Sequence, residues 1–124
     1  DYFNGRFTNG YNFADLFALQ RTGAPATAFL AGGTNFAVGG ARATTNADVS
    51  PDLAAQLGSW TGFTAGVADP SALYLINAGG NDLRAISDGL ADAPAPVDVG
   101  SAIASAVQYL NDAGARWVVP HRVV

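Results

Sequence analysis

The residue types that are missing from this sequence narrow its chemistry at once. Among 124 residues there is no Cys, Met, Glu or Lys, and there is one His. Without cysteine the chain forms no disulfide and has no thiol nucleophile or thiolate metal ligand. All the acids are Asp, all the bases are Arg, and the net charge is −4. This charge, with no basic cluster, argues against nucleic acid or an anionic membrane surface as a partner.

Long apolar runs are absent as well. No stretch approaches the roughly 18–20 residues that span a bilayer, and no signal-peptide pattern is present. Because the chain starts at Asp1 and has no Met, we expect a processed or cloned start. Apolar residues make up 49% of the chain, which is enough for a packed core. With no repeat and no domain boundary visible, we predict a single domain over residues 1–124.

Apolar residues at helical spacing, with capping residues before them, predict four helices. We expect them at residues 12–21 with Asn12 as the cap, at 50–64 opened by Ser50-Pro51, from 81 until the prolines near 94, and at 98–113 with Asp98 as the cap.

Three short apolar runs predict strands. We expect them at residues 35–38, 72–77 and 117–119, with the second buried on both faces of a sheet and Pro120 marking the end of the third. Helices and strands that alternate in this way predict an α/β fold with a parallel sheet.

Glycine and asparagine follow two of the predicted strands. One strand ends in Gly39-Gly40, and the other in Ala78-Gly79-Gly80-Asn81-Asp82. Ligands bind beyond the carboxyl ends of parallel strands, where glycine lets backbone N–H groups approach closely and Asn offers a side-chain NH₂. A backbone donor and an amide donor aimed at one oxygen would form an oxyanion hole.

Four segments of the chain resemble those of the SGNH (GDSL-type) esterases and lipases. They follow the order of that family and span nearly the whole chain: Asn4-Gly5-Arg6-Phe7-Thr8-Asn9-Gly10, Gly32-Gly33-Thr34-Asn35-Phe36-Ala37-Val38-Gly39-Gly40-Ala41, Ala78-Gly79-Gly80-Asn81-Asp82, and Ala113-Gly114-Ala115-Arg116-Trp117-Val118-Val119-Pro120. The resemblance implies a three-layer, flavodoxin-like α/β sandwich that hydrolyses carboxylic or lipid esters without a cofactor or metal.

The resemblance also implies roles for single residues. Asn81 matches the asparagine that donates to the oxyanion from its side chain. Gly40 matches the glycine that donates from its backbone N–H, with Gly39 as the alternative. The resemblance gives Asp82 a role in organising the turn. Arg6 and Asn9 would fix the loop near the site.

Two parts of the family pattern do not appear between Asp1 and Val124. The G-D-S block with the serine nucleophile should come before Asp1, and the D-x-x-H block should follow Val124. We therefore expect a domain truncated at both ends that contributes the oxyanion hole. Without the first strand the sheet would have an unpaired edge, which predicts dimerisation, strand exchange or low stability.

Other readings of these residues remain open. His121 could act as a substitute base in a rearranged site, but it is also explained as an exposed terminal residue. A replacement nucleophile would have to come from six serines, none of which lies on a glycine-flanked elbow: Ser50, Ser59, Ser71, Ser87, Ser101 and Ser105.

The glycine pairs and the aspartates have alternatives too. The glycine pairs could be tight turns or could cradle a phosphate, although neither completes a nucleotide-binding pattern. Asp82, Asp88 and Asp92 could suggest a metal, but the last two are one helical turn apart, which is typical of a solvated face.

Three functions follow from these observations. The chain is part of an esterase, a non-catalytic remnant that binds a ligand or a partner chain, or a short hydrolase with a rearranged site. The family resemblance favours a small-molecule or lipid ester as substrate. It also favours a secreted or outer-membrane-associated bacterial protein.

Overall fold

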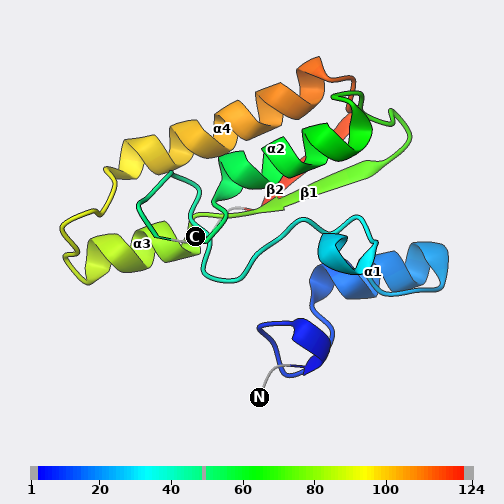
Figure 1. The fold of residues 1–124 in the computed structure, drawn as a ribbon, viewed down its shortest axis with the longest axis horizontal. Coiled ribbons are helices and arrows are strands. Elements are labelled where there is room, and N and C mark those ends of the chain that lie inside the picture. Colours follow the sequence, from blue (N-terminus) through cyan, green and yellow to red (C-terminus); the bar gives the residue numbers. More distant parts are fainter. Residues whose placement is uncertain (1–2, 49, 122–124) are drawn as a thin grey trace. The chain divides into compact units, whose positions relative to one another are not determined.

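A computed structural model describes residues 3–48 and 50–121 of the chain. These described residues form two compact units, Asp1–Gly39 (unit 1) and Gly40–Val124 (unit 2). Figure 1 shows the helices and strands of both. Each unit is described by itself below.

Unit 1 is built around one helix, α1 (Phe13–Thr22), between two single-turn helices, η1 (Phe3–Gly5) and η2 (Phe29–Ala31). The Asn12 side chain accepts from the Asp15 N–H and the Asp15 side chain accepts from the Asn12 N–H, which is a reciprocal capping box. Gly23, with a φ of 79°, ends the helix. The predicted helix at 12–21 is confirmed.

An ion pair between the part-buried Arg6 and the buried Asp15 organises unit 1. The Arg6 guanidinium donates from Nε and Nη2 to the two Asp15 carboxylate oxygens at 2.7 and 2.8 Å, and also to the Ala26 carbonyl at 3.1 Å. Asp15 is 1% exposed, and no apolar residue of this unit is buried among the described ones. The hydrogen bond from Arg6 lowers the pKa of Asp15. Arg6 therefore has the loop-fixing role that the sequence predicts.

The strand predicted at residues 35–38 is wrong. Only Asn35 pairs, in an isolated bridge with Ala28, and residues 36–38 are not in a strand. The Asn35 side chain accepts from the Ala37 N–H at 3.1 Å, a local bond that competes with a strand ladder. Phe36 instead stacks on Phe29, with ring centroids 4.6 Å apart.

Unit 2 contains a parallel sheet of two strands, β1 (Leu73–Asn77) and β2 (Trp117–His121). Leu73 pairs with Trp117, and the register continues to Asn77 opposite His121. The helices are α2 (Leu53–Thr64), α3 (Gly80–Ser87) and α4 (Pro96–Asp112). The parallel sheet and the helices around it confirm the predicted α/β class.

Helices α2 and α4 cover one face of this sheet. The ring of Trp60 in α2 meets Tyr74 of β1 edge-on at 6.1 Å and Tyr109 of α4 at 6.3 Å. Ile76 lies on the same face as Tyr74 and is buried. The buried apolar residues all belong to unit 2: Ala43, Leu53, Trp60, Ala68, Ile76, Ala85, Val99, Ala106, Leu110 and Ala115.

The opposite face of the sheet is open to solvent. Leu73 and Leu75 are each 37% exposed, and Trp117 and Val119 are 63% and 49% exposed. These four residues pair in register, so they share that face. The prediction that β1 is buried on both faces is therefore wrong for this chain.

Several predicted boundaries also need correction. Helix α2 starts at Leu53 after Asp52 as N-cap, so Ser50 does not cap it. Helix α4 starts at Pro96, which puts Asp98 in its first turn and makes Ala95 the cap. Strand β2 continues through Pro120 to His121, because nothing among the described strands pairs with its outer edge and proline is tolerated on an edge strand. None of the helices in the described ranges is both long and apolar enough to cross a membrane.

Candidate active site

The turn after β1 starts the candidate site. Gly79 takes a φ of 102° as the N-cap of α3, and a Cβ there would lie 3.3 Å from the Val99 side chain. Both the left-handed backbone and the close contact favour glycine at this position. The turn places Asn81 and Asp82 in the first helical turn of α3, beyond the carboxyl end of β1.

The Asn81 side chain joins this turn to the segment that follows Gly40. Its Nδ2 donates to the Ala41 carbonyl oxygen at 2.8 Å, across 40 positions of sequence. A carboxamide carries two N–H donors, so this bond orients the amide plane and leaves a second N–H. Asn81 is exposed, and that second donor can reach a ligand.

Gly40 is held in a conformation that suits glycine. Its φ is 86°, and a Cβ would lie 3.3 Å from the Ser50 hydroxyl. Gly40 is exposed, and no hydrogen bond to its backbone N–H occurs within residues 3–48 and 50–121. In unit 1, a Cβ on Gly39 would overlap the Phe7 ring. Gly40 therefore favours glycine because of its backbone conformation, whereas Gly39 favours glycine because a side chain would collide with Phe7.

The Asp82 carboxylate binds the segment that follows Gly40. Its Oδ2 accepts from the Ala43 N–H at 2.7 Å, and its Oδ1 accepts from the Thr44 N–H at 3.1 Å and the Thr44 hydroxyl at 2.6 Å. The Asp82 residue is 0% exposed. A carboxylate in the first turn of a helix is also favoured by the helix dipole. The sequence predicts that Asp82 organises its own turn, whereas its carboxylate bonds lead to residues 43 and 44, nearly 40 positions away.

A second buried carboxylate holds the same segment. Asp52, at the N-cap of α2, accepts from the Arg42 N–H at 2.8 Å and the Asn46 N–H at 2.9 Å, and is 5% exposed. The Arg42 guanidinium reaches Asp92, with the closest ion-pair distance 3.2 Å. Residues 41–44 are therefore held to α2, to α3 and to the loop after α3.

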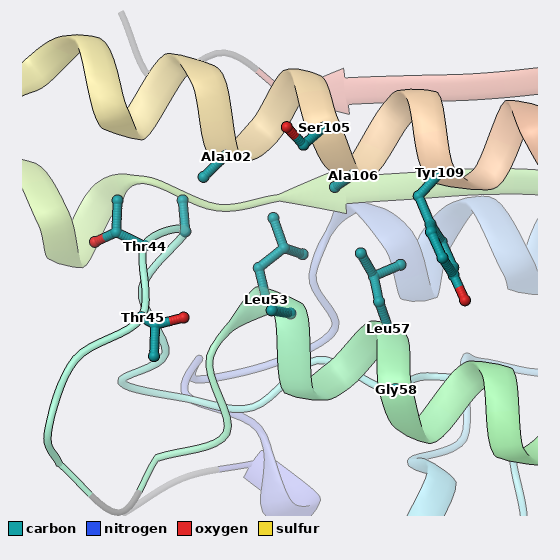
Figure 2. A pocket seen from close by; sticks show the side chains of 11 residues that line it. Thr44, Thr45, Leu53, Leu57, Gly58, Ala102, Ser105, Ala106 and Tyr109 are labelled. Atoms are coloured by element: carbon teal, nitrogen blue, oxygen red, sulfur yellow. The ribbon is translucent and has the colours of Figure 1, made fainter.

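A groove of about 570 Å³ opens beside this segment, between α2 and α4. Figure 2 shows Leu53 and Leu57 of α2 facing Ala102 and Ala106 of α4, with Thr44 at one end. Most of the lining is apolar, and the α4 side chains are small except for Tyr109 at one end. The groove belongs to the helical layer that covers the sheet.

The remaining candidates of the sequence do not gather at this site. His121 ends β2 opposite Asn77, and its side chain lies outside the described residues. Asp88 pairs with Arg84 at 3.5 Å and Asp92 with Arg42, so the aspartates have separate partners. Within the described ranges no cluster of His and Asp suits a metal ion.

The predicted loop role of Asn9 and the alternative of a replacement serine nucleophile find no supporting contact among the described residues. Asn9 is exposed, and its side chain makes no hydrogen bond within the described part of unit 1. Ser59 and Ser71 bond locally, the first to the Ala55 carbonyl and the second to Asp69. The hydroxyl of Ser50 lies near Gly40, and the Asp48 carboxylate accepts from the Ser50 N–H at 2.8 Å rather than from its hydroxyl.

Sequence reasoning missed Thr44, Asp52 and Arg42. The N-cap residue Asp52 carries a local signal, because an Asp directly before an apolar helical run is a common cap. Thr44 has none, since its partner Asp82 lies 38 positions away.

Comparison with known proteins identifies a family for the chain. The family model for GDSL-like lipases and acylhydrolases matches residues 1–123. No curated protein and no solved structure matches the chain.

Proposed function

Because the chain belongs to the GDSL-like lipase and acylhydrolase family, we propose that it contributes the oxyanion hole of a serine ester hydrolase. The donors are the Gly40 backbone N–H and the second N–H of the Asn81 side chain. The supporting observation is the 2.8 Å bond from Asn81 to the Ala41 carbonyl, which brings the amide beside the residue after Gly40.

These donors act when a nucleophile attacks the ester carbonyl. The carbonyl oxygen then becomes negative, and donors that are already oriented stabilise it more than they stabilise the neutral ester. Each such donor contributes about 10²–10³ in kcat. The serine and the Asp–His pair of the family pattern would come from sequence flanking Asp1 and Val124.

Substrate, location and partners are part of this proposal. The family favours a small-molecule or lipid ester, and a secreted or outer-membrane-associated protein. The open sheet face favours association with a second copy, because parallel sheets in α/β proteins are covered on both faces. It also suits the alternative of a non-catalytic remnant that binds a partner chain.

Kinetics of the protein as its gene encodes it would test the proposal. Reading the coding sequence on both sides of residues 1–124 should reveal G-D-S upstream and D-x-x-H downstream. In that protein Asn81→Ala should lower kcat for p-nitrophenyl butyrate by about 10²–10³, with little change in KM. Asn111→Ala, at an exposed asparagine of α4, is the matched control. Equal kcat values for the two variants would refute the proposal.

A further inference from the structure

The segment that follows Gly40 has little freedom to move. The Ala41 carbonyl accepts from Asn81, the Arg42 N–H donates to Asp52, and the next two N–H groups donate to Asp82. The Arg42 carbonyl also accepts from the Leu53 N–H at 3.0 Å. Gly40 therefore joins a segment whose backbone is bound almost continuously.

Asp82 makes the shortest of these bonds to the segment. Its bonds to the Thr44 hydroxyl and the Ala43 N–H are 2.6 and 2.7 Å long, and they are charge-assisted. Because the carboxylate is 0% exposed, water does not compete for it. The Thr44 hydroxyl is the one side-chain donor in this contact.

Asp82 follows Asn81 directly in the same helical turn. Asn81 carries one proposed oxyanion donor. Asp82 holds the segment that directly follows Gly40, the residue whose N–H is the other donor. The separation of the two donors therefore depends on the contact between Asp82 and residues 43–44. A displacement of such groups by about 1 Å is enough to cost an oxyanion hole much of its effect, on the order of 10²-fold in rate.

We propose that Asp82 and the Thr44 hydroxyl form a positioning pair that sets the Gly40 N–H and the Asn81 side-chain NH₂ at the spacing one anionic oxygen needs. The inference rests on the proposed function. Neither residue touches the substrate; both act through the backbone of residues 41–44.

Substitutions at Thr44 separate positioning from a purely structural role. Thr44→Val removes the hydroxyl but keeps the backbone N–H bonded to Asp82, and Thr44→Ser restores the hydroxyl. Thr45→Val is the matched control, because Thr45 is exposed and its hydroxyl makes no hydrogen bond among the described residues. Asp82→Asn keeps the shape but removes an acceptor and the charge.

The experiment titrates the ¹⁵N-labelled 124-residue chain with butylphosphonate, a tetrahedral anion, and follows two NMR signals. We expect the Gly40 amide and the Asn81 side-chain NH₂ to shift with one common Kd. Thr44→Val and Asp82→Asn should each raise that Kd by about tenfold, which corresponds to the free energy of about one lost hydrogen bond. Thr44→Ser and Thr45→Val should stay within about twofold of the wild type.

The Asp82 variant makes the test sharper. Removing a negative charge near the site would by itself strengthen anion binding. Weaker binding by Asp82→Asn therefore supports positioning, and equal or tighter binding overturns it. If that variant does not fold, wild-type affinity in Thr44→Val overturns it as well.

The two proposals fail in different ways. If neither signal shifts in the wild type, the oxyanion proposal fails and the positioning pair with it. If both signals shift in the wild type but all variants bind equally, Asp82 has only a structural role and the proposed function stands.

Discussion

Replacing Asp52 by alanine should cost unit 2 a large part of its stability. Two N–H groups donate to this carboxylate, and it is 5% exposed. The Arg42 N–H belongs to a residue that is 8% exposed, so water would not readily replace the lost acceptor. An unsatisfied buried donor costs about 1–3 kcal/mol, and the half-buried Asn46 N–H adds less. We expect Asp52→Ala to lower the free energy of unfolding by about 2–4 kcal/mol.

Urea unfolding followed by far-UV circular dichroism measures this change. Asp98→Ala is the control, because Asp98 is exposed in the first turn of α4 and should cost about 0.3–1 kcal/mol through the helix dipole alone. If Asp52→Ala cost no more than Asp98→Ala, buried carboxylates would not hold residues 41–44.

Three further changes have expected outcomes. Ala65, the C-cap of α2, has a φ of 54°, so Ala65→Gly should raise the melting temperature through about 0.5–1 kcal/mol of relieved strain; an unchanged or lower value contradicts this. Asp15 has a lowered pKa because Arg6 donates to it, so its contribution is complete above about pH 3.9 and lost as pH falls through its lower folded-state pKa. The protection factors of the α1 amides, which correct exchange for its intrinsic pH dependence, should fall in that acidic range, and Asp15→Asn should make them nearly independent of pH there; the same protection profile in both proteins would count against the ion pair. Trp117 is 63% exposed on the open sheet face, so light scattering should find dimers that Trp117→Asp converts to monomers, whereas a stable wild-type monomer would refute self-association.

Local signals predicted the parts of the fold that depend on neighbours in sequence. Helix α1 carries its own cap in Asn12, which the sequence predicts and the structure confirms, and its own stop in Gly23. The start of α2 was misplaced because Ser50, Pro51 and Asp52 are all plausible first residues. The bonds that Arg42 and Asn46 donate to Asp52 show which of the three residues precedes the helix, and these bonds are not visible in the local sequence.

The strands and the site depend on contacts between residues far apart in sequence, and these contacts could not be predicted from local patterns. Residues 35–38 have the apolar character of a strand, but only Asn35 finds a partner. The exposure of Leu73 and Leu75 depends on what covers the sheet, which the run of apolar residues does not encode. At the site, the family motifs identify Asn81 and Gly40 from sequence, whereas Thr44 is identified only by its contact with Asp82 in the structure.

Turnover of p-nitrophenyl butyrate by the 124-residue chain tests the central claim most directly. Losing the nucleophile or base costs on the order of 10⁶ in a serine hydrolase, far more than one oxyanion donor contributes. If the chain supplies the proposed oxyanion donors without a nucleophile, it should therefore give a rate close to that of buffer. Steady turnover that disappears in Asn81→Ala would contradict this account, and would indicate a rearranged site that uses His121 and a nearby serine.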